Sequence, residues 1–272
     1  MKVQIIIPTI NLWKKYTEPC IQSVFKACEG LDYRILLVDN ASTDETLIEA
    51  GKLVSDKFAH KRNERIWGCA ETWNWGIKDA FERGYDYVFV INNDVLLHPE
   101  SIKQLLNRFE QSKKHDEGVE REFYSDHYMR DSFLENIAMI TCMDVTGECP
   151  QPQAVFDLAI FDKANVPESE HPCFSGFMID RRCWEKVGVF DENFKPAYYE
   201  DNDYHYRINL ARLKAIVLPT SLFYHYGSRT NLEAFAKPFI DSSRNHKYYQ
   251  HKWGGDPGRE KYTIPFNNLN TI

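Results

Sequence analysis

The sequence predicts an α/β fold in which a Rossmann-like, mostly parallel sheet is flanked by helices. Apolar, β-branched runs alternate with helical segments along the first third of the chain. The runs at 3–7, 33–38 and 87–91 are apolar at consecutive positions, which is typical of strands buried on both faces of a parallel sheet. Each run ends in polar residues, and this is where open α/β sheets gather ligands.

Helices are expected between these strands. Residues 16–27, 45–58 and 70–83 place apolar side chains at helical spacing, and a further helix is expected from Glu100. The charged segment 111–122 is expected to form a solvated loop or a helix end.

The second half of the chain mixes strands, turns and helices. Strands and turns are expected over 136–160, a helix over 181–187 that ends at Gly188, a helix over 198–211, and a late strand over 215–218. The last forty or so residues are expected to form a helix followed by an extended tail.

Composition narrows the class of protein. The formal charge of −7 and the pI near 5.7 argue against a nucleic-acid-binding surface. The seven cysteines show no CxxC pair, so neither a disulfide framework nor a zinc site is favoured, and a reducing, cytoplasmic location fits best. No uninterrupted apolar run approaches the ~18 residues that a membrane span needs.

Asn92, Asn93 and Asp94 directly follow the strand at 87–91. A hard divalent cation such as Mg²⁺ or Mn²⁺ takes oxygen ligands, often one or two carboxylates with water and substrate phosphates, so Asp94 is a candidate metal ligand. The alternative is a turn in which these side chains cap backbone groups.

Glu200, Asp201 and Asp203 gather at a predicted helix start. A carboxylate fixed there is well placed to act as a general base, although helix capping explains the same residues. His225 follows a strand and is a candidate second metal ligand, with a packed histidine as the alternative. Asp39 is a candidate partner for a ribose or a base, with a capping turn as the alternative.

The order of these motifs resembles glycosyltransferase family 2. A strand ending in PTIN is followed by VDNASTDET, GCAETWNWGI, NND, SGFMIDRRCWEKVGVFDENF, EDNDYHYRI and a late histidine, over about residues 3–230. The resemblance implies a GT-A type fold, a nucleoside diphosphate sugar donor, Mn²⁺ or Mg²⁺, and an inverting mechanism.

The resemblance also implies roles for individual residues. Nucleotide-sugar binding falls on Pro8, Thr9, Asn11, Asp39, Asn40, Gly68, Asn74, Asn92, Asn93, Ser175 and Gly176. Metal binding falls on Asp94 and His225. Catalysis falls on the pair Glu200 and Asp201, with Asp201 as the base.

Two positions depart from the family pattern. Asn92 stands where the metal motif usually has its first carboxylate, and Asn40 replaces an acid. Such variants resemble the rhamnosyltransferase-like branch, so hexosyl and deoxyhexosyl transfer both fit. The resemblance divides the chain into a GT-A domain at 1–235, with a nucleotide-binding half at 1–110 and an acceptor and catalytic half at 136–235, and a C-terminal helix and tail at 236–272.

The acceptor is left open: a glycan, a lipid-linked sugar or another hydroxyl compound. We expect its contacts in the segment 111–136 and in the C-terminal tail. The many aromatic residues of the second half are expected to line the acceptor cleft or to make core and homo-oligomer contacts. A nucleotidyltransferase and a non-catalytic nucleotide-sugar or glycan-binding module are the alternative functions.

Overall fold

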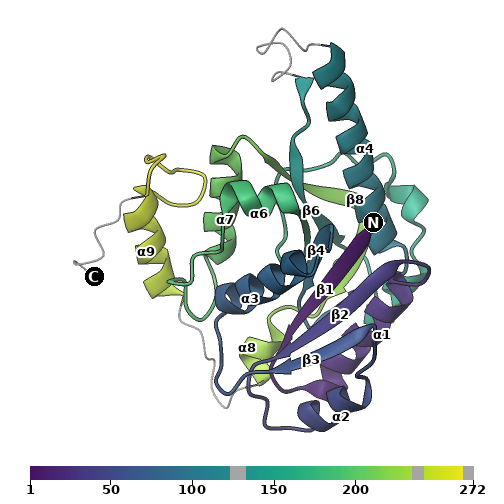
Figure 1. Ribbon diagram of the computed structural model, residues 1–272. Coiled ribbons are helices and arrows are strands. Elements are labelled where there is room, and N and C mark those ends of the chain that lie inside the picture. Colours follow the sequence, from purple (N-terminus) through teal and green to yellow (C-terminus); the bar gives the residue numbers. More distant parts are fainter. Residues whose placement is uncertain (123–132, 235–241, 266–272) are drawn as a thin grey trace.

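The computed structural model describes residues 1–122, 133–234 and 242–265, and these ranges form an α/β structure around a single sheet. The sheet has the order β3-β2-β1-β4-β7-β6-β8-β5 (Figure 1). Its strands are β1 (Lys2–Thr9), β2 (Asp32–Asp39), β3 (Phe58–Arg62), β4 (Tyr87–Ile91), β5 (Val95–Leu97), β6 (Ile137–Asp144), β7 (Gly176–Asp180) and β8 (Lys214–His225).

Most of the strands run in one direction. β1 pairs in parallel with β2 and β4, β2 with β3, and β6 with β8. β7 lies antiparallel between β4 and β6, and β5 lies antiparallel to β8. The carboxyl ends of β1 to β4, β6 and β8 therefore meet at one edge of the sheet, where β7 begins.

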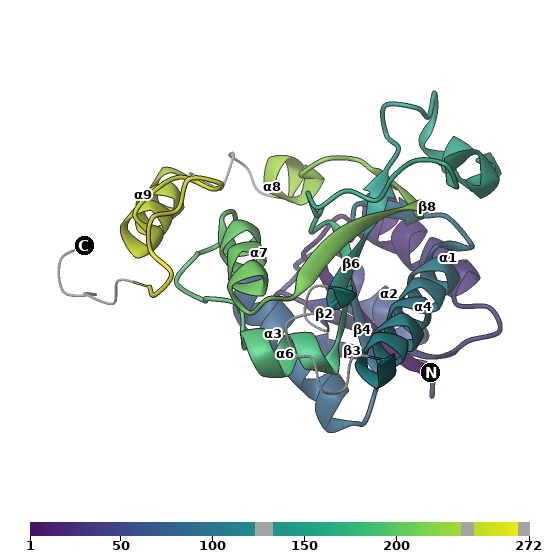
Figure 2. The ribbon, with the colours of Figure 1, turned by 90° about the horizontal axis from the view of Figure 1, so that it is seen from above.

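Helices cover both faces of the sheet, and the expected α/β architecture is confirmed. Two apolar clusters, one on each face, form the core. The first is contributed by the sheet with α1 (Glu18–Ala27), α2 (Thr46–Lys52) and α4 (Ser101–Glu122), and the second with α3 (Cys69–Glu82), α6 (Arg181–Val187) and α7 (Glu200–Leu210). Figure 2 shows α1 and α4 on one side of the sheet and α3, α6 and α7 on the other.

The shorter elements surround the carboxyl edge and the outside of the molecule. They are the π-helical turn η1 (Trp13–Thr17), the 3-10 turns η2 (Pro152–Asp157) and η3 (Ile160–Lys163), and the helices α8 (Arg229–Glu233) and α9 (Ser243–Trp253). Figure 1 shows α9 outside α7, away from the sheet. No described helix is both long enough and apolar enough to cross a lipid bilayer.

Close packing of α3 on β1 explains one glycine. A Cβ atom on Gly76 would lie 2.7 Å from the Cδ1 atom and 3.1 Å from the Cγ2 atom of Ile6, so any larger residue would force the buried Ile6 side chain to move. Gln4, a buried polar residue of β1, bonds to the same helix through Asp79. The helix is thereby fixed over the strand whose end supplies part of the candidate site.

The helix expected over 45–58 is wrong beyond Lys52. Leu47, Ile48 and Val54, which suggested a buried helical face, have exposed fractions of 45%, 66% and 60%. The chain turns after Lys52 and enters β3, an edge strand whose polar residues give no buried-strand pattern. The short strand β5 was not predicted either.

The charged segment 111–122 forms the C-terminal part of α4, so of the two predicted alternatives the helix end is the correct one. Asp116 and Val119 are buried within it, although its charged residues gave a strongly polar pattern. Figure 1 shows the end of α4 projecting from the sheet. Of the segment in which acceptor contacts were expected, 123–132 lies outside the described residues.

Candidate active site at the carboxyl edge of the sheet

The loop after β1 is held by a buried network of polar side chains. The hydroxyls of Thr9 and Thr17 lie 2.8 Å apart, and the Asn93 amide donates to both, at 3.2 and 3.0 Å. Asn11 and Leu12 follow with φ of 54° and 59°, a left-handed conformation that costs non-glycine residues energy. Strain of this kind clusters at functional sites, and here it turns the chain from the strand into η1.

Asp39, at the end of β2, is an ionised carboxylate with its hydrogen bonds filled. Its Oδ1 accepts from the Ser42 amide at 2.8 Å, and its Oδ2 accepts from Arg62 at 2.7 Å. Burial alone would raise the pKa of Asp39, but hydrogen bonds from His60, Ser42 and Arg62 hold it below its ordinary value. The side chain is fully buried, so it orders the loop around it.

Asn40 joins this loop to α3. Its side-chain oxygen accepts from the Asn63 amide at 2.9 Å, and its nitrogen donates to the Thr72 hydroxyl at 3.3 Å. The next residue, Ala41, has a φ of 60°. The ends of β2 and β3 and the first turn of α3 are therefore fixed together at the sheet edge.

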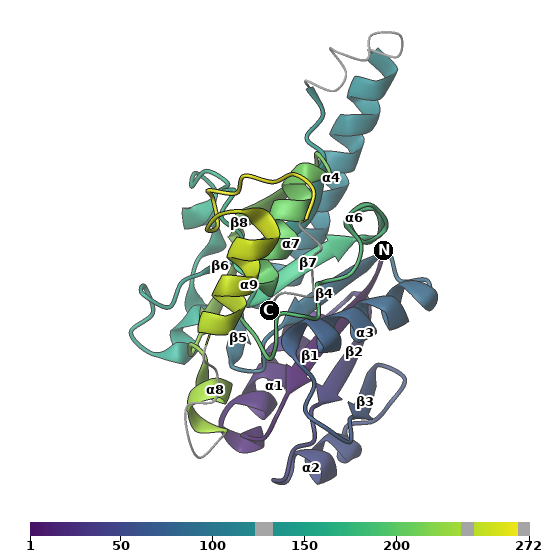
Figure 3. The same cartoon turned by 90° about the vertical axis from the view of Figure 1, so that its left-hand side faces the viewer.

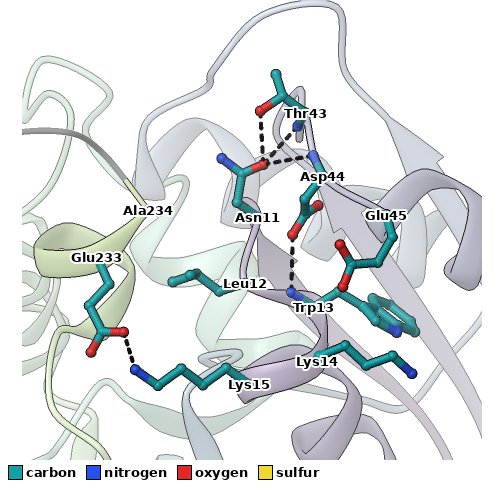
Figure 4. A pocket seen from close by; sticks show the side chains of 10 residues that line it. All are labelled: Asn11, Leu12, Trp13, Lys14, Lys15, Thr43, Asp44, Glu45, Glu233 and Ala234. Atoms are coloured by element: carbon teal, nitrogen blue, oxygen red, sulfur yellow. Dashed lines mark hydrogen bonds and ion pairs between the residues drawn. The ribbon is translucent and has the colours of Figure 1, made fainter.

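A pocket of about 360 Å³ opens beside these loops (Figure 4). It is lined by residues 11–15, 43–45 and 233–234. Asn11 accepts hydrogen bonds from the Thr43 amide at 2.7 Å and the Asp44 amide at 3.4 Å, which joins two walls. Glu233 of α8 pairs with Lys15, and it accepts from the Tyr16 hydroxyl at 2.9 Å. A segment far along the chain thus closes the pocket.

Asp94 and His225 meet where β4 and β8 end. The His225 Nε2 atom lies 3.3 Å from the Asp94 Oδ1 atom, and His225 Nδ1 hydrogen-bonds with the Ser175 hydroxyl at 3.3 Å. Asp94 is buried, and its Oδ2 accepts from the Arg229 amide at 2.9 Å. The two predicted metal ligands are therefore neighbours, and Ser175 orients the imidazole.

The carboxylate of Asp94 and the imidazole of His225 fit a divalent cation that takes its remaining ligands from outside the protein. His225 Nε2 is buried and makes no hydrogen bond within the described ranges, although it faces the carboxylate of Asp94. The described residues hold no group of three His, Cys, Asp or Glu side chains suited to a metal. A cation here would take its other ligands from water and from the phosphates of a substrate.

The acidic residues at the start of α7 have three different environments. Glu200 is buried with its Oε2 atom unpartnered among the described residues, and burial together with the charge of Asp201 raises its pKa well above the ordinary value. Burial also raises the pKa of Asp201, which is partly exposed. Asp203 is fully buried and ion-paired with Arg207 at 2.9 Å. Asp201 is thus the member of the trio that a substrate can reach.

The charge of Asp201 acts on two cysteine thiols. Burial raises the pKa of Cys69, at the start of α3, and the acids at the start of α7 raise it further. Burial also raises the pKa of Cys173, with Asp144 and Asp201 among the lesser causes. Cys173 is two residues before Ser175, which contacts His225, the last residue of β8. The charge of Asp201 therefore acts on the same short segment before β7 that contacts the Asp94–His225 pair through Ser175.

The structure also gives the contacts of the remaining residues that were expected in the site. Pro8 pairs with Val38 within the sheet, and Asn92 donates its amide to the Ser175 carbonyl at 2.9 Å. A Cβ on Gly176 would make only ordinary contacts, whereas one on Gly68 would lie 3.1 Å from the Pro196 carbonyl.

Asn74 exchanges hydrogen bonds with the backbone of Phe190 and donates to Glu192. Its donor-binding role stays a prediction, as do those of the other site residues.

Sequence reasoning missed two partners of the site. Arg62 lies on β3, the strand that was not predicted, so its pairing with Asp39 could not be foreseen. Glu233 reaches Lys15 across 218 positions of sequence, and no local pattern indicates such a contact. Conversely, the rule that parallel strands share a carboxyl edge was enough to bring Thr9, Asp39 and Asp94 together.

Comparison with known proteins gives a consistent picture. The family model described as Glycosyl transferase family 2 matches residues 4–178, more than half of the chain. A dolichol-phosphate mannosyltransferase of Pyrococcus furiosus is 34% identical over 106 residues, which cover 38% of this chain and 28% of that protein.

Solved structures of S. aureus TarS 1–349 share the fold. One matches with 19% identity and a TM-score of 0.52 over 86% of this chain and 63% of that chain. Another, in complex with UDP-GlcNAc, matches with 18% identity and a TM-score of 0.56 over 91% of this chain and 64% of that chain. The chain thus spans less than two thirds of the length of each of these relatives.

Proposed function

We propose, on the premise that this chain belongs to glycosyl transferase family 2, that it transfers a sugar from a nucleoside diphosphate to an acceptor hydroxyl with inversion. One observation carries the proposal. The carboxylate–imidazole pair of Asp94 and His225 contacts Ser175, and the charge of the partly exposed Asp201 acts on Cys173, two residues earlier in the segment that precedes β7. A base and a phosphate-neutralising group at one segment are what a single displacement at a sugar carbon requires.

In the proposed reaction, Asp201 accepts the proton of the acceptor hydroxyl. The freed oxygen forms a bond to the anomeric carbon of the donor while the bond from that carbon to the phosphate oxygen breaks. The electron pair leaves with the nucleoside diphosphate, on the face opposite the attack, so the configuration inverts. The burial that raises the pKa of Asp201 makes its ionised form a stronger proton acceptor than an exposed aspartate.

Asp94 and His225 would hold a Mn²⁺ or Mg²⁺ ion together with the donor phosphates. The bound ion would supply positive charge beside the leaving diphosphate. The Ser175 hydroxyl, at 3.3 Å from His225 Nδ1, fixes which way the imidazole faces. Because the protein offers one carboxylate and one imidazole, we expect metal binding to be weak until the donor adds its phosphates.

The donor is proposed to be a nucleoside diphosphate sugar, hexosyl or deoxyhexosyl. Binding of UDP-GlcNAc by TarS, a structural neighbour, and the mannosyl transfer in the name of the Pyrococcus furiosus relative support this class. The pocket beside Asn11 and Thr43 borders the ends of β1 and β2, where α/β sheets bind nucleotides. The acceptor is proposed to be a glycan, a lipid-linked sugar or another hydroxyl compound.

The test is a donor panel. UDP-, GDP- and dTDP-linked sugars are screened by thermal shift with and without MnCl₂, since a ligand that binds only the folded chain raises the melting temperature. Each donor that binds is then assayed for release of its nucleoside diphosphate. We expect at least one donor to bind and to be turned over only with the metal. Binding without turnover in any assay would favour the non-catalytic binding module, and transfer of a nucleotidyl group would favour the nucleotidyltransferase.

A further inference from the structure

The C-terminal helix α9 contacts the chain on both sides of the candidate base. Figure 3 shows α9 in front of α7, on the side away from the sheet. Upstream of the base, the side-chain nitrogen of Asn245, a residue that is 1% exposed, donates to the carbonyls of Ala197 and Tyr198 at 2.8 and 3.1 Å. These two carbonyls lie three and four positions before Asp201.

The backbone that Asn245 holds is strained. Tyr198 and Tyr199 have φ of 75° and 74°, in the left-handed region that non-glycine residues avoid. The Tyr199 ring stacks on His246 of α9, with centroids 5.1 Å apart. Two consecutive residues in this conformation persist only where the surroundings impose it, and the contacts named here come from α9.

Downstream of the base, α9 holds Asp203. The Lys252 ammonium lies 2.6 Å from Asp203 Oδ1, and the Trp253 indole N–H donates to the same atom at 2.8 Å. Lys252 also pairs with Asp191 at 2.7 Å, and Arg207 pairs with the other oxygen of Asp203 at 2.9 Å. The fully buried Asp203 and the half-buried Asp191 are thus balanced by two bases, and a network of this kind favours one arrangement of its side chains.

We infer that α9 positions the catalytic base: Asn245 and Lys252 fix the backbone before and after Asp201, and so fix its carboxylate toward the acceptor. Both are positioning residues, because neither touches the proposed substrates. The inference rests on the proposed function, in which Asp201 removes the acceptor proton. It gives the C-terminal helix a part in the reaction, although the sequence indicates only a helix followed by a tail.

The experiment compares three full-length variants, Asn245→Ala, Lys252→Met and Lys252→Arg, with the unmodified chain. It uses the donor that the panel identifies. A base displaced by a fraction of an ångström costs turnover, so we expect kcat to fall about tenfold or more in the first two variants. The donor KM should stay unchanged, since the contacts of Asn245 and Lys252 named above are with Ala197, Tyr198, Asp191 and Asp203, none of which is proposed to bind the donor. Lys252→Arg keeps the charge and should restore most of kcat.

Hydrogen–deuterium exchange supplies a readout that needs no substrate. Amides of residues 197–203 should exchange at least about tenfold faster in Asn245→Ala, while those of β1 keep their protection. Lys247→Met is the matched control, because Lys247 is exposed on the same helix, and it should change neither measurement. Asn245→Ala also covers the case in which Lys252→Met fails to fold.

The outcomes distinguish the positioning role of α9 from the proposed function. Unchanged kcat and unchanged exchange at 197–203 in Asn245→Ala overturn the positioning role, whereas the proposed function survives. An equal loss of donor affinity and kcat in all variants, Lys252→Arg included, assigns α9 to general stability and also overturns it. Full turnover by Asp201→Asn contradicts the proposed function itself, whatever α9 does.

Discussion

The two halves of the carboxyl edge treat their carboxylates in opposite ways. At the end of β2, Asp39 is fully buried with hydrogen bonds to both oxygens, and these hold its pKa below the ordinary value. At the start of α7, Glu200 has an unpartnered oxygen within the described ranges, and burial raises the pKa of both Glu200 and Asp201. The carboxylate of Asp39 is therefore held in its ionised form, whereas burial favours the protonated forms of the two acids at the start of α7.

The backbone follows the same division. The loops after β1 and β2 each contain left-handed residues, but their side chains close a network that keeps them in place. Tyr198 and Tyr199, before α7, depend on α9, which comes from the far end of the chain. The loops after β1 and β2 are thus ordered by residues at neighbouring strand ends of the sheet, whereas the backbone before Asp201 is ordered by a helix that lies outside the sheet (Figure 3).

The largest effect is expected for Asp94→Asn. The change removes the charge that would hold the cation, so both metal-dependent donor binding and turnover should fall, the latter by about 10²-fold or more. Thermal shift with donor and MnCl₂, together with initial rates, measures both. His225→Asn should act in the same direction, whereas the exposed Asp86→Asn should have no effect. Full metal-dependent stabilisation in Asp94→Asn would remove this residue from the site.

Asp201→Asn should distinguish the role of the base from that of the donor-binding residues. It leaves the donor side intact, so donor binding should be nearly unchanged while turnover falls by roughly 10²-fold, the usual scale for a lost general base. Titration calorimetry gives the binding and initial rates give the turnover. Donor affinity that falls in parallel with kcat would show that Asp201 belongs to the donor half.

Asp39→Asn should act on stability first. The substitution leaves the Arg62 and Ser42 donors without a charged acceptor, at a cost of about 1–3 kcal/mol in the free energy of unfolding. Because the folded-state pKa of Asp39 is lowered, its contribution is present above the ordinary value of 3.8 and is lost as pH falls through the folded pKa. Urea unfolding at pH 7 and at pH 3 should therefore show a larger difference from the unmodified chain at pH 7. An equal difference at both pH values would argue against the carboxylate as its source.

Glu200→Gln should have the smallest and opposite effect. A folded-state pKa raised above 4.5 means that the carboxyl contributes stability at lower pH, and this contribution is lost as pH rises through the folded pKa. The neutral amide should therefore raise the free energy of unfolding at neutral pH, by on the order of 1 kcal/mol, relative to the unmodified chain. Melting temperatures across pH 4–8 test this, with the exposed Glu185→Gln as control. If Glu200→Gln is instead less stable than the unmodified chain at pH 8, other groups in the protein must offset the cost of burying the charged carboxylate.

The sequence predicted the buried strands and the order of the site residues along the chain, but not the residues that hold those site residues in place. β4 and α6 have the predicted bounds, because continuous apolar runs and a terminal Gly188 are local signals. The sequence does not predict β3, because an edge strand needs no apolar pattern. The helix before β3 ends earlier than predicted, because the apolar side chains that suggested its buried face are exposed. The contacts of α9 with Ala197, Tyr198 and Asp203 join segments about fifty positions apart. No periodicity records such contacts.

Paramagnetic broadening by Mn²⁺ tests the central claim most directly, because it reports which amides surround the ion. The chain, labelled with ¹⁵N, is titrated with MnCl₂ in the presence of UDP, GDP or dTDP. If the base and the metal site share one pocket, the amide signals of 94–95, 174–175, 201–202 and 225–226 should broaden together, with 201–202 at a slightly higher metal concentration. Sharp signals at 201–202 when those at 94–95 have vanished would contradict the account.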